Sequence, residues 1–140
     1  MRFITSVDGL PIAQGSKRHV GRGVMIESSK ALKPWRQKIT LTAKNSLLLH
    51  DDEWEPGCKG PISAQLTFFF PRPMRLPMVR RGWPTVRPDV DKLSRAVLDG
   101  LTDAGVWGDD SQVVRLVAAK RYGAARVEIE LEELEWSGDV

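Results

Sequence analysis

Cysteine and histidine are scarce in this chain of 140 residues, which has one cysteine, Cys58, and two histidines, His19 and His50. A single cysteine cannot form an internal disulfide, and it cannot build a metal site from several thiolates. The two histidines lack the short spacing of zinc ligands. The chain also has no glycine-rich phosphate loop and no serine nucleophile motif. The sequence therefore indicates neither a disulfide-stapled protein, nor a zinc enzyme, nor a serine hydrolase.

Long apolar runs are also missing. The run Leu66–Phe70, which ends at Pro71, is far shorter than the roughly 20 residues of a membrane-spanning helix. The first residues do not follow the charged-then-apolar pattern of a secretory signal. We therefore expect a cytoplasmic protein without a membrane partner.

The charges are unevenly distributed, although the net charge of +3, from 21 basic and 18 acidic residues, is small. Between Gln14 and Leu48 the only acidic residue is Glu27, and the basic residues there are Lys17, Arg18, Arg22, Lys30, Lys33, Arg36, Lys38 and Lys44. A second basic group contains Arg72, Arg75, Arg80, Arg81 and Arg87, whereas the last residues are rich in glutamate. Such a pattern is typical of a protein that attracts a polyanion, and equally of a solvated surface of mixed charge.

Apolar periodicity predicts one α/β domain that spans residues 1–140. The predicted strands are 2–7, 24–26, 62–70 and 112–119, and the predicted helices are 32–49 and a shorter one that begins near Asp89 or Asp91 and stops at Gly105. Ser28 or Ser29 is the expected cap of the first helix. Residues 14–23 are expected to form a flexible loop, 73–86 a mobile loop and 136–140 a disordered tail.

Four aspartates flank the shorter helix: Asp89 and Asp91 at its start, and Asp109 and Asp110 after its end. One aspartate is enough to cap a helix, so the second at spacing two and the later pair need another explanation. Ionised carboxylates that gather repel one another unless a cation neutralises them, and oxygen ligands suit Mg²⁺. We therefore predict that the strand after Asp110 returns beside the start of the helix, and that these carboxylates hold a divalent cation.

The residues from Pro88 to Val113 resemble the signature of RusA-type Holliday junction resolvases. That signature reads aspartate, any residue, aspartate, asparagine and leucine, then a helix that ends in a tryptophan, and then paired aspartates with a glutamine shortly after. The matching residues are Asp89, Asp91, Leu93, Trp107, Asp109, Asp110 and Gln112. The chain departs from the pattern at Lys92, which replaces the asparagine, and at Arg95, which replaces a catalytic lysine. A weaker flanking match covers most of the chain.

The resemblance implies an α/β (α+β) fold, in which a small mixed sheet of about four strands packs with two helices and the last strand covers 127–131. It also implies a Mg²⁺-dependent DNA endonuclease, with Mn²⁺ as a substitute, that acts as a homodimer. Such an enzyme resolves four-way junctions by paired symmetric nicks in DNA recombination and repair, often in phage-related genomes.

By position, the implied catalytic residues are Asp89, Asp91, Asp110 and Arg95, and the implied metal ligands are the same three aspartates together with Asp109. The basic residues expected to contact branched DNA are Lys17, Arg18, Arg87, Lys92 and Lys120. The high pKa of an arginine argues against proton transfer by Arg95, so its expected contribution is positive charge near the phosphate.

Three other functions remain open at this point. If Lys92 and Arg95 mark a loss of catalysis, the chain is a module that binds branched DNA without cutting it. The same chemistry could act on flaps or replication forks. The chain could also be a structural α/β domain whose acidic helix is merely capped and paired with lysines, and such a domain would bind neither Mg²⁺ nor Mn²⁺.

Overall fold

The chain folds around a four-stranded mixed sheet. The fold is that of a computed structural model, which describes residues 1–15, 17–19, 25–27, 30–50, 53–75 and 82–137. The strand order is β1 (Arg2–Asp8), β6 (Arg126–Glu133), β4 (Ile62–Phe70) and β5 (Val113–Tyr122). β5 runs parallel to β4, whereas the other neighbours are antiparallel. The prediction of a small mixed sheet with two helices is confirmed.

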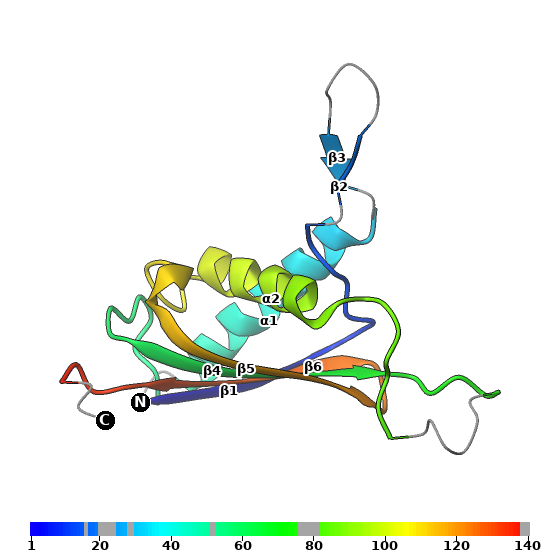
Figure 1. The fold of residues 1–140 in the computed structure, drawn as a ribbon. Helices are drawn as coiled ribbons and strands as arrows, with labels where there is room; N and C mark the ends of the chain where they lie inside the picture. Colours follow the sequence, from blue (N-terminus) through cyan, green and yellow to red (C-terminus); the bar gives the residue numbers. More distant parts are fainter. Residues whose placement is uncertain (16, 20–24, 28–29, 51–52, 76–81, 138–140) are drawn as a thin grey trace.

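Two helices, α1 (Leu32–Leu49) and α2 (Val90–Ala104), cover one face of this sheet (Figure 1). Along α1, the buried residues Trp35, Ile39, Ala43 and Leu47 recur every four positions. Residues at this spacing lie on one face of a helix, so α1 presents a single apolar stripe. The hydrophobic core lies between that stripe, the buried side of α2 and the sheet.

The buried face of the sheet follows from alternation along its strands. In β4, every second residue from Ile62 to Phe68 is buried, because successive side chains of a strand point to opposite faces. In β6, Val127, Ile129 and Leu131 are buried in the same way. None of the helices in the described parts of the chain is long and apolar enough to cross a bilayer.

The boundaries of α1 and β4 match the predicted residues, and several smaller expectations need correction. The N-cap of α1 is Ala31, without a side-chain cap hydrogen bond, whereas Ser28 and Ser29 lie outside the described residues. Part of the predicted loop 14–23 is strand, because β2 (Lys17–His19) pairs with β3 (Met25–Glu27). Residues 73–75 and 82–86 contain neither helix nor strand, and 76–81 and 138–140 are outside the description. The mobility of the loop 73–86 stays a prediction.

Helix α2 is the crossover that connects the parallel strands β4 and β5, a connection that parallel pairing requires. It ends at Gly105, whose φ of 77° places it in the left-handed region that favours glycine. A short 3₁₀ helix, η2 (Asp110–Gln112), follows and leads directly into β5. The start of β5 is therefore tied to the C-terminal end of α2.

The two helices pack closely against each other at Gly100. A Cβ atom at this position would lie 2.7 Å from Cγ2 of Ile39, which is fully buried. The hydroxyl of Thr40 donates a hydrogen bond of 3.0 Å to the Gly100 carbonyl. Only glycine therefore allows α1 to lie this close to the backbone of α2.

We expect Gly100→Ala to lower the free energy of unfolding by about 1 kcal/mol, measured by urea denaturation. Overpacking a well-filled core costs roughly 1–3 kcal/mol, which exceeds the gain of about 1 kcal/mol in helix propensity. Gly82→Ala is the control, because no heavy atom lies within 4 Å of its added Cβ. Equal stability of the two variants would contradict the close contact with Ile39.

Candidate active site

The first acidic group lies at the N-terminal end of α2. Asp89 is the N-cap residue with an extended backbone, φ −74° and ψ 140°, yet its side chain makes no cap hydrogen bond. Its carboxylate is exposed and forms an ion pair of 3.7 Å with the ammonium of Lys92. Asp91, in the first helical turn, is exposed and makes no side-chain hydrogen bond or ion pair within the described chain. Capping therefore does not account for either aspartate.

Lys120 of β5 connects the N-terminal end of α2 to the sheet. Its ammonium, on β5, donates hydrogen bonds to the carbonyls of Val86 at 2.6 Å and Pro88 at 2.9 Å. These bonds fasten the segment immediately before Asp89 to the far half of β5. Lys120 was predicted as a DNA contact, which stays a prediction. An ammonium has three donors, so one is left for a phosphate.

The segment Gln14–Gly15 packs against α2 beside the same end. The backbone N–H of Gln14 donates to the Lys92 carbonyl at 3.0 Å, and its side-chain amide donates to the carboxylate of Asp99. Asp99, expected to form an ordinary surface pair, is thus a partner of Gln14. A Cβ at Gly15 would lie 2.6 Å from Nη1 of Arg95, so the exposed Arg95 guanidinium extends along this segment.

The second acidic group lies in the turn that contains η2. Gln112 accepts hydrogen bonds from the backbone N–H groups of Gly108, at 2.8 Å, and Asp109, at 2.9 Å. Its amide nitrogen donates to the carbonyls of Cys58 and Gly60 at 2.7 and 3.1 Å. Gln112 therefore joins the acidic turn to the loop before β4. Sequence reasoning recorded this glutamine only as part of the signature.

The two aspartates of this turn have different roles. The Asp109 carboxylate accepts a 3.0 Å hydrogen bond from the Ser111 N–H and completes a capping box with Gln112. Hydrogen bonds from the Ser111 side chain and backbone hold the pKa of Asp109 below its ordinary value of 3.8. Asp110 is half-buried, and its side chain makes no hydrogen bond or ion pair with any other described residue. Asp109 is thus a capping residue, and Asp110 is available to a ligand.

The acidic turn is fixed at the C-terminal end of α2. The Trp107 indole donates a 2.8 Å hydrogen bond to the hydroxyl of Thr102, in the last turn of the helix. Trp107 also forms an isolated parallel bridge with Cys58. Both contacts place the turn at the opposite end of the helix from Asp89 and Asp91 (Figure 1).

Two lengths show that the acidic ends cannot share an ion within one chain. The axis of α2 from Val90 to Ala104 is about 21 Å long at 1.5 Å per residue. Along β5, Val113 and Lys120 are about 23 Å apart at 3.3 Å per residue. Ligand oxygens lie only about 2.0–2.6 Å from a bound Mg²⁺ or Ca²⁺. Consistently, no group of three histidine, cysteine, aspartate or glutamate residues in the described parts could hold a metal.

The prediction that β5 starts beside the N-terminal end of α2 is therefore wrong. A crossover helix carries the chain back along the sheet, so β5 has to begin where α2 ends. Only its far half, at Lys120, reaches the segment before Asp89. Of the remaining predicted DNA contacts, Arg87 is exposed and Lys92 half-buried, whereas the side chains of Lys17 and Arg18 are not among those described.

Comparison with known proteins decides the family. The family described as endodeoxyribonuclease RusA matches residues 8–132, which is most of the chain. The chain belongs to the RusA family. RusA membership supports a Holliday junction-resolving endonuclease, and it agrees with the signature at Asp89–Gln112.

Three relatives are similar to the chain over different lengths. An uncharacterised Bacillus subtilis (strain 168) protein, YqaN, is 30% identical over 92% of this chain and 94% of its own length. A crossover junction endodeoxyribonuclease RusA of Shigella sonnei (strain Ss046) is 30% identical over 71% of the chain and 70% of its own length. A protein of the same description from Lactococcus phage r1t is 35% identical over 53% of the chain and 56% of its own length.

We expect Ser111→Ala to raise the pKa of Asp109 toward 3.8, because the side-chain hydrogen bond from Ser111 is the largest cause of its depression. A depressed carboxyl pKa stabilises the fold above the ordinary pKa, and this contribution disappears as the pH falls. The variant should therefore lose less stability on acidification. Carbon-detected NMR titration of the Asp109 carboxyl measures the shift, and the exposed Ser137→Ala serves as control. An unchanged pKa in Ser111→Ala would refute the assignment.

Proposed function

We propose that this chain is a Mg²⁺-dependent endonuclease that resolves Holliday junctions by paired symmetric nicks in DNA recombination and repair. The family match over residues 8–132 supports the nuclease class. The observation that carries the site is that Asp89, Asp91 and Asp110 have no capping hydrogen bond, whereas the neighbouring Asp109 does. Within the described residues, the Asp89 carboxylate has only the ion pair with Lys92, so a cation could replace that lysine.

Asp89 and Asp91 are proposed to hold the metal together with Asp110, with Asp109 supporting Asp110. Their carboxylate oxygens suit Mg²⁺, and Mn²⁺ could substitute. When bound, such an ion supplies Lewis-acid activation of the scissile phosphate. The guanidinium of Arg95 lies in the next helical turn after Asp91, where its permanent charge would stabilise negative charge that develops on the phosphate.

A second copy of the chain is needed to complete this site, because one chain holds the aspartates at opposite ends of α2. The outer edge of β5 supports a homodimer. Val114, Leu116 and Val117 are 64%, 45% and 44% exposed. β4 is its only strand partner among the described residues. Exposed apolar residues on an unpaired strand edge favour pairing with another strand.

Symmetric antiparallel pairing of two β5 edges, centred between Leu116 and Val117, would also assemble the site. In this register, Val113 faces Lys120 of the partner subunit. Lys120 holds the segment just before Asp89, and Val113 follows η2, which begins at Asp110. Asp110 would thus approach the partner subunit's Asp89 and Asp91. The two-fold axis would create two equivalent sites, one for each nicked strand of a junction.

Two alternatives remain, and the departures at Lys92 and Arg95 favour only the first of them. A binding module without cleavage follows if these residues cannot replace the asparagine and lysine of the family pattern. A nuclease for flaps or forks keeps the site and changes only the substrate. An experiment with Mg²⁺ separates these functions. The protein is incubated with mobile four-way junctions, fixed four-way junctions, forks and flaps, and the position of each nick is mapped.

We expect Asp91→Asn to reduce junction cleavage by at least about 100-fold, because it removes a charged oxygen ligand from the proposed site. Junction binding should change little. Cleavage is measured with Mg²⁺, and binding by gel shift in Ca²⁺. The control is Asp8→Asn, which removes an exposed aspartate on β1. Undiminished cleavage by the Asp91 variant would exclude this aspartate from the site.

Mixing Asp91→Asn with Asp110→Asn tests whether two chains share each site. Each variant alone should be inactive. In a mixed dimer, a shared arrangement leaves one site with both aspartates and the other with neither, so single-strand nicking returns without paired resolution. After random exchange, roughly half of the dimers are mixed. If each site lay within one chain, both sites of the mixed dimer would lack an aspartate, and no nicking would return.

A further inference from the structure

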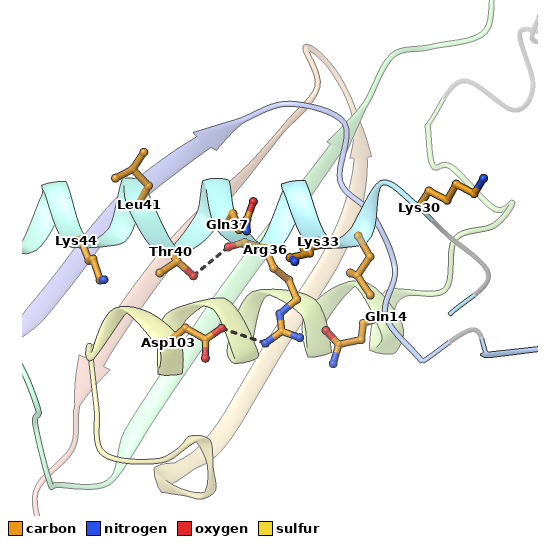
Figure 2. Close-up of a pocket in the computed structure, with 10 residues that line it drawn as sticks. Gln14, Lys30, Lys33, Arg36, Gln37, Thr40, Leu41, Lys44 and Asp103 are labelled. Atoms are coloured by element: carbon orange, nitrogen blue, oxygen red, sulfur yellow. Dashed lines mark hydrogen bonds and ion pairs between the residues drawn. The ribbon is translucent and has the colours of Figure 1, made fainter. Parts of the chain in front are cut away.

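A basic groove lies between α1 and α2, outside the acidic site (Figure 2). It has a volume of about 850 Å³. Its lining residues are Gln14, Lys30, Leu32, Lys33, Arg36, Gln37, Thr40, Leu41, Lys44 and Asp103. Four of these residues are basic and one is acidic. We propose that this α1 groove binds the phosphodiester backbone of a DNA arm, an inference that rests on the proposed function.

Three basic residues of the groove lie in a row along α1. Together with the polar Thr40, the residues Lys33, Arg36 and Lys44 are spaced by three or four positions, so they lie along one side of the helix. The row from Lys33 to Lys44 is about 16 Å long at 1.5 Å per residue. Each strand of duplex DNA rises about 3.4 Å per base, so the row spans roughly five base pairs.

Most of this positive charge is not neutralised by the protein. Asp103 forms an ion pair of 3.0 Å with Arg36. Lys30, Lys33 and Lys44 are exposed and make no ion pair with the residues described. These lysines could therefore pair with the phosphates of a ligand without first breaking an ion pair to a described residue.

The groove is connected to the acidic site. Gln14 lines it and donates its backbone N–H to the carbonyl of Lys92, the residue after Asp91. A DNA strand that reached Asp89 and Asp91 could therefore continue along the groove. This path is distinct from the previously expected contacts at Lys17, Arg18, Arg87, Lys92 and Lys120.

The opposite face of the sheet carries charges of both signs. No described helix covers that face, where Glu128, Glu130 and Glu132 alternate with the buried residues of β6. Glu130 forms an ion pair with Arg2, and Glu128 forms one with Arg126. The α1 groove differs from this face, because its three lysines make no ion pair with the described residues.

The test measures the affinity for a fluorescent four-way junction over a range of salt concentrations. K33Q/K44Q and the control K38Q/K59Q each remove two exposed lysines, inside and outside the α1 groove respectively. All proteins carry Asp91→Asn so that the junction stays intact. For K33Q/K44Q we expect roughly tenfold weaker binding near 0.1 M salt and a salt slope smaller by about 2, because each lost phosphate contact reduces the slope by about 0.9. The control should change the affinity by less than about twofold.

Equal affinities and slopes for the groove and control variants would overturn the proposal, since the groove lysines would then act only through the overall charge. The single variants K33Q and K44Q guard against misfolding of the pair, because each should reduce the slope by about 1. Circular dichroism confirms folding. The proposed endonuclease function fails separately, if the unsubstituted protein cleaves no branched DNA in the presence of Mg²⁺.

Discussion

The rigid length of α2 is the constraint on which the site depends. Asp89 and Asp91 lie at its N-terminal end, and Trp107 fastens the turn with Asp110 to its C-terminal end by its bond to Thr102. Two features of the fold fix the length and position of α2. The helix connects the parallel strands β4 and β5, and it packs against Ile39 of α1 at Gly100. Any centre that uses aspartates from both ends must therefore recruit them from two chains.

This separation also explains how one chain accommodates four aspartates around a single helix. Four carboxylates gathered without a cation would repel one another and raise their pKa values. In the chain, the two pairs are kept apart by the helix, and Asp109 is stabilised by hydrogen bonds from Ser111 and by its place in the capping box. In the proposed dimer, the two pairs would meet, and their repulsion would then require a neutralising cation.

Sequence patterns predicted the local elements of this fold well. The limits of α1 and β4 were found from apolar periodicity, and the end of α2 from Gly105, because each signal depends on residues near one another in the chain. The direction in which β5 returns was mispredicted. It depends on the parallel pairing of β4 with β5, which involves residues about 50 positions apart, as in the pair Ile62 and Val113. Residue type was enough to identify the aspartates of the candidate site. The distance between the aspartates at the two ends of α2 is a consequence of the topology.

Roles that depend on long-range contacts were likewise not readable from the sequence. Gln112 was part of a recognisable motif, but its amide bonds to Cys58 and Gly60 require the folded chain. Lys120 resembled a DNA contact, and its bonds to Val86 and Pro88 make it a support of Asp89 as well. Two of the three donors of its ammonium are used within the described chain, so substitution of Lys120 would disturb the position of Asp89 whether or not Lys120 also contacts DNA. Lys30, Lys33 and Lys44 of the α1 groove are different, because they make no such bonds or ion pairs with the described residues, and their substitution should disturb the fold less.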